Sequence, residues 1–378
     1  MRVVFLTHNY PRKPGDITGA PLGTLARALT RRGVSVRVIT PSDKSDEVVV
    51  DGVPVVQVKV ARSVRALVSN NDRVASALKT PLGWLALRRL RNAMRAAARR
   101  EIASGTDLLH AHWWLPAGLA APPGIPLVLT VGGIDASLLR RSRVARSLAR
   151  PVFQRASTVT VVSREIGNWV QAAAGRFVDS AFIHPMPADT RGYPWTRGGA
   201  GAVVISRLVQ SKRVDLALET VAVLASYGHN FPLTIVGDGP ERTALEQRAS
   251  SLGISALVRF VGAKTGHEAR AYLERPDVML FTARGEGMPL AAIEALACGV
   301  PVVASWDSGA AVDIVPESGP GRLTLPSPEA LADSVLDLQR DPDRLAMGRL
   351  VGESWRARLA PDNVAELCEG WYRNALAR

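Results

Sequence analysis

The sequence contains little cysteine and no long hydrophobic run. Only two cysteines, Cys298 and Cys368, occur in 378 residues, so a disulfide framework is disfavoured and a reducing cytosol fits the composition. No apolar run reaches the roughly 20 residues that a membrane-spanning helix requires. The opening "MRVVFLTHNYP" has too short an apolar part for a signal peptide and is typical of a strand and a turn. We therefore expect a cytoplasmic protein.

Negative charge is scarce in one quarter of the chain. The formal net charge is +13, and residues 61–150 hold 15 Lys or Arg against four Asp or Glu. The helical pattern of residues 82–100 places four of these cations on one stripe: Arg88, Arg91, Arg95 and Arg99. A solvated outer face, an anionic membrane surface on the inner side of the membrane and an acidic acceptor all remain open. Nucleic acid is disfavoured, because no known recognition motif accompanies the charge.

Short β-branched runs alternate with longer amphipathic stretches along the chain. This alternation predicts an α/β protein with parallel, doubly wound sheets covered by helices. Residues 184–202 are rich in Pro and Gly, interrupt the alternation and predict a linker. We expect domains at 1–195 and 196–360, with a C-terminal helix at about 361–378 that packs back on the first. Two such domains would face each other across a ligand-binding cleft at the carboxyl ends of their strands.

Two glutamates bracket the beginning of one predicted helix. In "ARGEGMPLAAIEALACGVPVVAS", Pro289 suits the first turn, Leu290 to Ala297 favour a helix and Gly299 ends it. Glu286 then lies in the preceding loop and Glu294 within the helix. The free N–H groups and the dipole of a helix N-terminus favour an anion such as a diphosphate. The alternative is an ordinary strand, loop and helix with two exposed acids.

Other residues point to the same place. Arg207 and Lys212 follow the first strand of the second domain, where two cations would hold a diphosphate. Gly237 lies in a glycine-rich turn after the strand "PLTIVG", although the third glycine of the dinucleotide fingerprint is missing. Gly19 lies in a similar turn of the first domain, where it permits close approach to a ligand or simply gives a flexible loop.

The order "SRLVQSKRVD", "IVGDGP", "RFVG" and "EGMPLAAIEALACGVPVVAS" resembles the C-terminal domain of retaining glycosyltransferases of family 4. These enzymes have the GT-B fold and a Glu-x7-Glu element. "HNYPRKPGDITG" and "DLLHAHWWLPAGLAA" resemble the N-terminal domain of the same family more loosely. The resemblance covers nearly the whole chain. It implies a nucleotide-sugar-binding C-terminal domain and an acceptor-binding N-terminal domain.

The resemblance also implies roles for individual residues. Glu286 would contact hydroxyls of the donor sugar, Glu294 would bind the ribose, and Arg207 and Lys212 would neutralise the departing diphosphate. The remaining donor-site residues would face the sugar and the phosphates: Gly287, Met288, Pro289, Leu290, Gly237 and, from the first domain, Gly19. The family needs no metal or other cofactor. The sequence, likewise, has no His, Cys and Asp cluster with metal-ligand spacing.

The implied reaction is sugar transfer from a nucleotide-diphospho-sugar to an acceptor hydroxyl, with retention at the anomeric carbon and electrostatic stabilisation of the leaving group. The acceptor would be a lipid, a cell-wall glycan or a natural-product glycoside. Two other readings remain open: a sugar-nucleotide epimerase of the same fold, and a non-catalytic relative that binds nucleotide or anionic lipid.

The sequence departs from the family at one informative position. Many members have a histidine after the strand that corresponds to "PLVLTV", and Gly132 stands there in this chain. His112 and Asp135 are the candidates for lining the acceptor side. The alternative for His112 and its neighbour His110 is that one of them is packed and hydrogen-bonded in the core. The donor base, the donor sugar, the acceptor and the oligomeric state carry no decisive signature.

Overall fold

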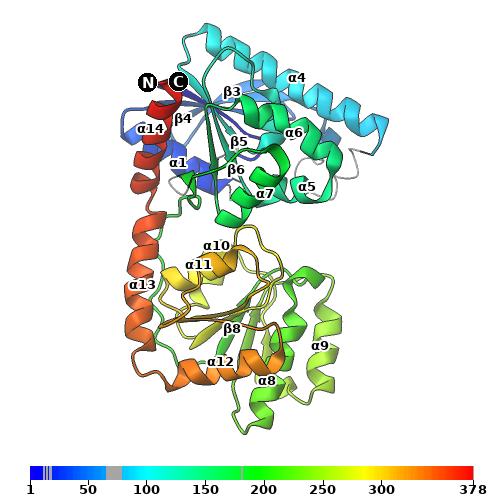
Figure 1. The fold of residues 1–378 in the computed structure, drawn as a ribbon, viewed down its shortest axis with the longest axis vertical. Helices are drawn as coiled ribbons and strands as arrows, with labels where there is room; N and C mark the ends of the chain where they lie inside the picture. The colour runs from blue at the N-terminus through cyan, green and yellow to red at the C-terminus, as the bar shows by residue number, and fades with distance from the viewer. Residues whose placement is uncertain (12, 14–15, 17–18, 65–78, 180–181, 378) are drawn as a thin grey trace. The chain divides into compact units, whose positions relative to one another are not determined.

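The computed structural model describes residues 1–378 except 12, 14–15, 17–18, 65–78, 180–181 and 378. The chain divides into two compact units (Figure 1). Unit 1 comprises Met1–Asp189 and Leu359–Arg378, and unit 2 comprises Thr190–Arg358. The boundary therefore lies at Asp189, whereas the sequence placed it at residue 195.

Unit 1 is built on a seven-stranded sheet of order β3-β4-β2-β1-β5-β6-β7. Its strands are β1 (Arg2–Leu6), β2 (Ser35–Ser42), β3 (Asp46–Val50), β4 (Val53–Lys59), β5 (Leu108–His112), β6 (Leu127–Val131) and β7 (Thr158–Val161). All neighbouring strands are parallel except β3 and β4, which are antiparallel. The sheet is therefore mixed, as doubly wound sheets with an antiparallel edge strand commonly are.

The edge strand β3 is absent from the sequence prediction. It joins β4 through the two residues Asp51 and Gly52, both with positive φ, 48° and 82°. Asp-Gly with two positive φ angles is the preferred two-residue hairpin turn, because its twist matches that of the flanking strands. The Asp51-Gly52 dipeptide is therefore the feature of the sequence that could have predicted this hairpin.

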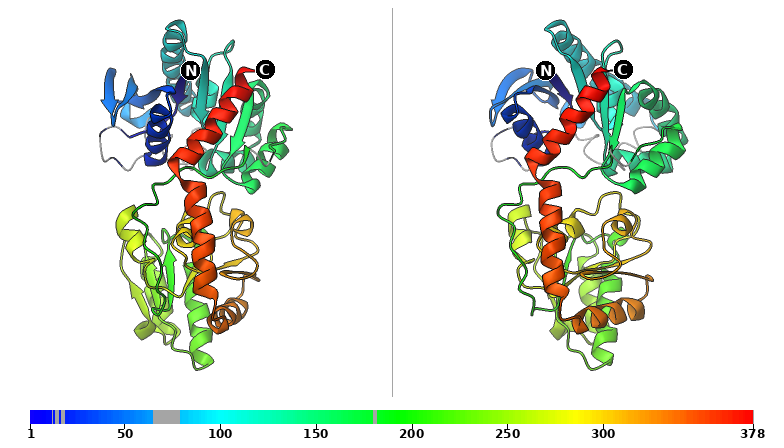
Figure 2. Two further views of the ribbon diagram at one scale, coloured as in Figure 1. Left: turned by 90° about the vertical axis from the view of Figure 1, so that its left-hand side faces the viewer. Right: turned by 60° about the vertical axis from the view of Figure 1, so that its left-hand side comes forward.

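The helices of unit 1 are α1 (Ala20–Arg31), α4 (Pro81–Ala103), α5 (Gly133–Arg141), α6 (Arg143–Arg155), α7 (Arg164–Ala174) and α14 (Pro361–Leu376), with a short helical turn η1 at Trp114–Gly118. α1 and α14 lie side by side and cover one face of the sheet (Figures 1 and 2). Their core includes Phe5, Leu29, Val36 and Tyr372. α4 packs on the other face, over β1, β2 and β4.

The predicted arginine stripe on α4 is interrupted at Arg95. The Arg95 guanidinium donates hydrogen bonds to the carbonyl oxygens of Leu119, at 2.8 Å, and Ala120, at 3.2 Å. Partial burial also lowers the pKa of Arg95. Arg95 therefore ties α4 to the chain beyond η1 and does not belong to a free basic face, whereas Arg88 and Arg99 are exposed.

Unit 2 is built on a parallel six-stranded sheet of order β10-β9-β8-β11-β12-β13. Its strands are β8 (Ala202–Ile205), β9 (Leu233–Val236), β10 (Val258–Phe260), β11 (Val278–Phe281), β12 (Val302–Ser305) and β13 (Gly321–Thr324). Its helices are α8 (Val214–Ser226), α9 (Arg242–Ser251), α10 (Gly266–Ala271), α11 (Leu290–Ala297), α12 (Pro328–Arg340) and α13 (Arg344–Leu359), with helical turns η3 (Gln210–Lys212), η4 (Ser255–Leu257) and η5 (Ala310–Asp313). α8 and α12 lie side by side on its core (Figure 1).

Arg356 forms hydrogen bonds that connect α13 to the end of α11 and to the segment at residues 193–194. The Arg356 guanidinium, on α13, donates to the carbonyl oxygens of Ala297 (2.7 Å), Tyr193 (3.0 Å) and Pro194 (2.9 Å). It also lies 3.6 Å from the centre of the Trp195 ring. The C-terminal end of α11 is thereby held to the segment that enters unit 2 and to α13.

Among the described helices, none combines the length and the apolar character needed to cross a membrane.

Candidate functional site

A pocket lies at the point where the sheet of unit 2 reverses direction. β8 and β11 are neighbours, but the chain continues from β8 to β9 on one side and from β11 to β12 on the other. The carboxyl ends of strands at such a switch point are where α/β sheets bind ligands. The β8–β11 pocket has a volume of about 180 Å³ and is lined by Val204, Ile205, Ser206, Lys212, Met279, Leu280, Phe281, Thr282, Ala283, Glu286, Met288, Leu290 and Ala291.

Lys212 and Glu286 meet in this pocket. Lys212 Nζ lies 2.8 Å from Glu286 Oε1, and their side chains are 16% and 27% exposed. The two residues come from different loops, one after β8 and one after β11. Their charges compensate each other while no ligand is present, and both groups can turn to a polar ligand that enters the pocket.

α11 begins beside Glu286. Pro289 precedes the helix as its cap, with φ −84° and ψ 70°, so it lies just before the first turn and not within it. The first described turn contains no acidic residue. Met288 and Leu290 line the pocket, and Leu290 is 56% exposed. The free N–H groups at this N-terminus give the pocket an anion-attracting edge.

The backbone at Glu286 is fixed by the loop after β12. Glu286 N donates to Ser308 O at 3.1 Å, and Ala310 N donates to Glu286 O at 2.7 Å. Gly309 has φ 70°, and a Cβ at this position would lie 2.5 Å from Glu286 O. Only glycine permits this approach, so Gly309 sets the position of Glu286.

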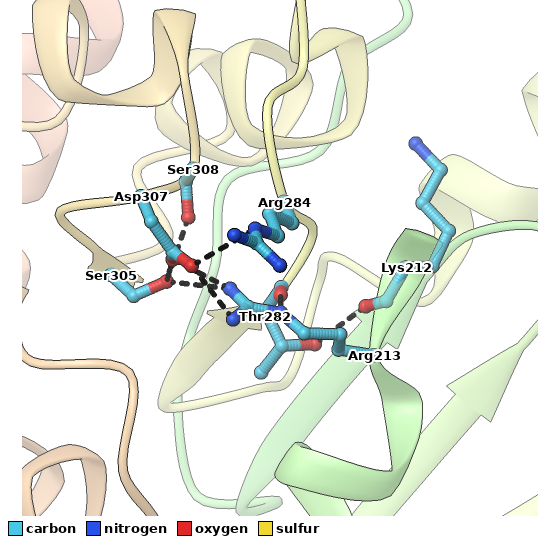
Figure 3. Close-up of polar contacts among 7 residues, drawn as sticks. All are labelled: Lys212, Arg213, Thr282, Arg284, Ser305, Asp307 and Ser308. Carbon is cyan, nitrogen blue, oxygen red and sulfur yellow. Dashed lines mark hydrogen bonds and ion pairs between the residues drawn. The ribbon is translucent and has the colours of Figure 1, made fainter. Parts of the chain in front are cut away.

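The turn that carries Lys212 is held by a polar cluster around Arg213, which the sequence analysis did not single out (Figure 3). Arg213, with φ 47°, forms two hydrogen bonds to Asp307, at 2.9 and 2.7 Å, and donates to Thr282 O at 2.8 Å. Ser305 Oγ donates to Asp307 at 2.8 Å. Thr282 Oγ1 donates to Lys212 O at 2.9 Å. In Figure 3 the Lys212 ammonium points away from this cluster.

The cluster therefore joins the loop after β8 to the ends of β11 and β12. The guanidinium of Arg213 and the carboxylate of Asp307 are joined by two hydrogen bonds, and this bidentate geometry fixes their relative orientation. Burial alone would raise the pKa of Asp307, but hydrogen bonds from Arg213 and Ser305 together lower it. Asp307 is thus a carboxylate at neutral pH, and Lys212 is presented to the pocket from a braced turn.

Glu294 lies within α11 and outside the set of residues that line the pocket. Its Oε1 accepts hydrogen bonds from Arg270, at 3.1 Å, and from the hydroxyl of Tyr193, at 3.2 Å. Arg270 also stacks over the Tyr193 ring at 4.7 Å. Burial raises the pKa of Glu294, although Arg270 and Tyr193 act in the opposite direction. The described contacts use Oε1 alone, and Oε2 has no partner among the described residues.

Two of the predicted donor-site residues, Arg207 and Gly237, do not line the β8–β11 pocket. Arg207 is exposed, and no described residue forms a side-chain hydrogen bond or ion pair with it. Gly237 lies against the loop after β8, where an added Cβ would be 1.7 Å from Ser206 O. Gly237 therefore lets two loops pack closely. Gly287 lies between Glu286 and Met288, which both line the β8–β11 pocket.

In unit 1, Gly19 caps α1 with φ 68°. A Cβ at Gly19 would lie 2.4 Å from Asn9 O and 2.7 Å from Tyr10 Cα. Gly19 thus packs closely against the loop that follows β1, and its approach to the phosphates of a donor stays a prediction.

His110 and His112 lie on the α14 side of β5, and both are buried. His110 hydrogen-bonds Tyr372 Oη (2.8 Å) and Thr130 Oγ1 (2.7 Å), as a packed core histidine does. His112 is 2% exposed, and neither of its ring nitrogens has a partner among the described residues. Burial lowers the pKa of both rings, so both are neutral at pH 7. In this state His112 does not offer an accessible face to an acceptor.

Asp135 is also buried, at 2% exposure. Its carboxyl oxygens accept hydrogen bonds from the backbone N–H of Trp114 (2.7 Å) and Gly132 (3.2 Å). Burial raises its pKa to about 8 against the opposing effect of these N–H donors. Asp135 therefore joins the turn after β5 to the turn after β6, and it is enclosed instead of lining an open acceptor side. Within the described residues, no group of His, Cys, Asp and Glu could hold a metal ion.

Comparisons with known proteins now identify the family. Residues 22–186 match the family model "Glycosyltransferase Family 4", and residues 195–349 match "Glycosyl transferases group 1". A GDP-mannose-dependent alpha-(1-6)-phosphatidylinositol monomannoside mannosyltransferase of Mycolicibacterium smegmatis is 30% identical over 60% of this chain and 66% of its own length. A 2-deoxystreptamine glucosyltransferase of Streptomyces kanamyceticus is 25% identical over 94% of this chain and 98% of its own length.

Solved structures agree at the level of the fold. Sucrose-phosphate synthase from Thermosynechococcus elongatus has a TM-score of 0.74 and 18% identity, covering 100% of this chain and 99% of its own. Anabaena HepE in complex with UDP has a TM-score of 0.71 and 18% identity, covering 99% and 100%. The two α/β units, the solved structures and the two matching family models lead to one conclusion. The chain belongs to glycosyltransferase family 4 and has the GT-B fold.

Proposed function

We propose that this glycosyltransferase moves a sugar from a nucleoside-diphospho-sugar to an acceptor hydroxyl with retention of configuration and without a metal. The observation that carries the proposal is the Lys212–Glu286 pair in the β8–β11 pocket, beside the N-terminus of α11. Family membership supports the transferase activity, and two kinds of relative are named as GDP-mannose-dependent mannosyltransferases. HepE was crystallised with UDP-glucose.

In this proposal each polar group of the pocket has one task. The Lys212 ammonium leaves Glu286 and neutralises the diphosphate, together with Arg207 and the N–H groups at the beginning of α11. Glu286 accepts hydrogen bonds from hydroxyls of the donor sugar and holds its orientation. Glu294 binds the ribose through Oε2 while Arg270 and Tyr193 fix Oε1.

The reaction then breaks the bond between the anomeric carbon and the diphosphate oxygen. The electron pair leaves with the diphosphate, whose growing charge Lys212 stabilises at the moment it develops. The acceptor oxygen bonds to the anomeric carbon from the face that the diphosphate leaves. A phosphate oxygen takes the acceptor proton, so no side chain is required as a base.

Purified protein tests the proposal with UDP-glucose and GDP-mannose as donors in the presence of EDTA. We expect nucleotide release in EDTA, loss of turnover in Lys212→Ala and retained turnover in Lys44→Ala, an exposed lysine of unit 1. Conversion of the donor to an epimeric sugar nucleotide would instead support the epimerase alternative. Nucleotide binding without turnover of any donor would support the non-catalytic alternative.

The surface of α4 supports a membrane-presented acceptor. At its N-terminal end Leu82, Trp84 and Leu85 are 80%, 39% and 42% exposed, and the exposed Arg88 and Arg89 follow within one turn. Apolar side chains beside arginines are typical of helices that lie in the surface of an anionic bilayer. We propose that this end of α4, in place of the full stripe to Arg99, rests on the inner face of the membrane.

Vesicle flotation tests this surface. The protein should float with vesicles that contain phosphatidylglycerol and much less with pure phosphatidylcholine. Leu82→Gln with Leu85→Gln should abolish flotation, whereas Leu350→Gln, an equally simple change at a 61% exposed leucine of α13, should not. Equal flotation of the double variant would refute the assignment to this end of α4, and absence of flotation of the parent protein would favour a soluble acceptor.

A further inference from the structure

The sheet of unit 1 has its own reversal point, between β1 and β5. From β1 the chain passes to β2 on one side, and from β5 it passes to β6 on the other. His8 follows the end of β1 and Trp113 follows the end of β5. Their rings lie together, with centroids 4.8 Å apart and planes tilted by 57°. An aromatic pair therefore occupies the place where a doubly wound sheet receives its ligand.

Trp113 is held there in an unusual conformation. Its φ is 73°, a value that a bulky side chain rarely adopts, and its N–H donates to Thr130 O at 2.8 Å. Such strained residues persist only where their surroundings fix them, and they concentrate at functional sites. Trp113 is only partly buried, and no described residue accepts a hydrogen bond from its Nε1.

Gly132 makes room for this indole. A Cβ at Gly132 would lie 2.9 Å from Trp113 Nε1 and 3.5 Å from Trp113 Cδ1. The φ of Gly132 is −108°, so its backbone would accept any residue. Trp113 therefore occupies the volume that a side chain at position 132 would fill. The indole can lie there because residue 132 is glycine.

Asp135 holds the turns that carry Trp113 and Gly132 together through hydrogen bonds. It accepts the N–H of Gly132 and the N–H of Trp114, and Trp114 Nε1 donates to Asp135 O at 3.0 Å. The turns that carry Trp113 and Gly132 are thus joined through a buried group. His8 adds a polar edge, because its Nδ1 has no partner among the described residues. Burial lowers the pKa of His8 to about 4, so the ring is neutral at pH 7, with one N–H donor and one acceptor nitrogen.

We propose that Trp113 and His8 form the acceptor subsite and that the acceptor presents a polyhydroxylated ring, a cyclitol or a pyranose, to the face of the Trp113 indole. The C–H face of such a ring is apolar and its edge carries hydroxyls. An indole supplies the matching flat apolar surface, and the Trp113 N–H supplies a hydrogen bond to the edge, with the polar His8 ring beside it. The proposal rests on the glycosyl transfer proposed above and narrows its acceptor class.

Fluorine NMR of the full chain labelled with fluorotryptophan tests ring binding directly. Trp113→Phe assigns the Trp113 signal among the eight tryptophans. Titration with myo-inositol and with 2-deoxystreptamine should shift this signal, and glycerol, an acyclic polyol, should not. A Trp113 signal that stays in place at saturating concentrations of both rings would overturn the proposal, as would an equal shift with glycerol.

Kinetics separate this inference from the proposed function. Trp113→Ala should raise the KM for a ring acceptor by roughly fivefold to tenfold, as expected for the loss of one aromatic face. Binding of UDP or GDP, which the proposed function assigns to unit 2, should be unchanged. Phe177→Ala, at a 69% exposed aromatic residue of unit 1, should alter neither the acceptor KM nor nucleotide binding. An unchanged acceptor KM refutes the subsite alone. Absence of both nucleotide binding and donor hydrolysis in the parent protein refutes the glycosyl transfer, while the NMR titration still decides the subsite.

Discussion

At the scale of single residues, the pocket of unit 2 contains one positive and one negative group that compensate each other at 2.8 Å. Each is a partner to the other before a ligand arrives, so replacing one leaves the other partly buried and unpaired. The two residues nevertheless have different expected tasks. We expect Lys212 to act on charge that develops in the transition state and Glu286 to hold hydroxyls of the donor sugar. Glu294, which lies outside this pocket, is expected to act on a ribose that is the same before and after the reaction.

Lys212→Ala should therefore lower kcat by about 100- to 1000-fold, the usual effect of removing one group that stabilises a developing anion. The donor KM should change much less. Steady-state kinetics with UDP-glucose or GDP-mannose measure both values. A large rise in donor KM with an unchanged kcat would contradict the role given to Lys212.

Glu294→Ala should weaken binding of UDP or GDP by roughly tenfold to 100-fold, because a charged acceptor of ribose hydrogen bonds is lost. Isothermal titration calorimetry measures this directly. Tyr193→Phe removes one neighbour of Glu294 Oε1 and leaves Oε2 in place, so it should have a much smaller effect. Equal losses from both variants would show that Glu294 acts through Tyr193 and not on the ribose.

At the scale of elements, the site consists of loops after β8, β11 and β12 that are joined by polar contacts. Strand, loop and helix from Val278 to Ser305 follow the sequence prediction closely, because alternating apolar runs, Pro289 and Gly299 are local signals. The Arg213–Asp307 pair is a tertiary contact between residues 94 positions apart. No local pattern reveals such a pair, and Arg213 resembles any surface arginine in the sequence.

The same reasoning explains the other differences. Asp51-Gly52 is a local signal for the hairpin of β3 and β4, but the sequence prediction relied on runs of β-branched residues and omitted β3. The enclosed position of Asp135 and the inward direction of Arg95 depend on distant carbonyl and N–H groups. Charge and spacing suggested an acceptor contact and a basic stripe, but burial decides which polar groups are available to a partner.

Asp307→Ala should lower kcat through the position of Lys212, since the turn at residues 210–213 loses its bidentate brace. It should also lower Tm, because Arg213 is left 21% exposed without its carboxylate partner. Affinity for UDP or GDP should change little. Thermal denaturation and kinetics on the same preparation test this, with Asp337→Ala, at a more exposed ion pair of α12, as the control. A normal kcat in Asp307→Ala would show that the brace serves stability alone.

At the scale of the whole molecule, unit 1 contains three histidines whose pKa burial lowers: His8 to about 4, His110 to about 3, and His112 well below its ordinary value. Unfolding exposes them to water, where their pKa returns to about 6.5. Below pH 6.5 the unfolded chain therefore binds protons that the folded chain does not, so stability falls as the pH falls towards 4.

Asp135 acts in the opposite sense. Its folded pKa of about 8 lies above its unfolded value, so its contribution falls as the pH rises towards 8. Three histidines outweigh one carboxyl below pH 6.5, and only the carboxyl acts above it. We expect Tm to be highest near pH 6.5 to 7 and to fall on both sides. A Tm that stays constant from pH 6.5 down to 5 would contradict the neutral, buried state of the histidines.

The matching family models assign the family, the solved structures support the fold, and the β8–β11 pocket carries the proposed chemistry. The central claim is retention without a metal. Time-resolved proton NMR of the sugar first released from UDP-glucose or GDP-mannose, in EDTA and with water as the acceptor, tests it most directly. The account predicts that the α-anomer appears first and the β-anomer follows by mutarotation. Initial release of the β-anomer, or turnover that EDTA abolishes and a divalent cation restores, would contradict it.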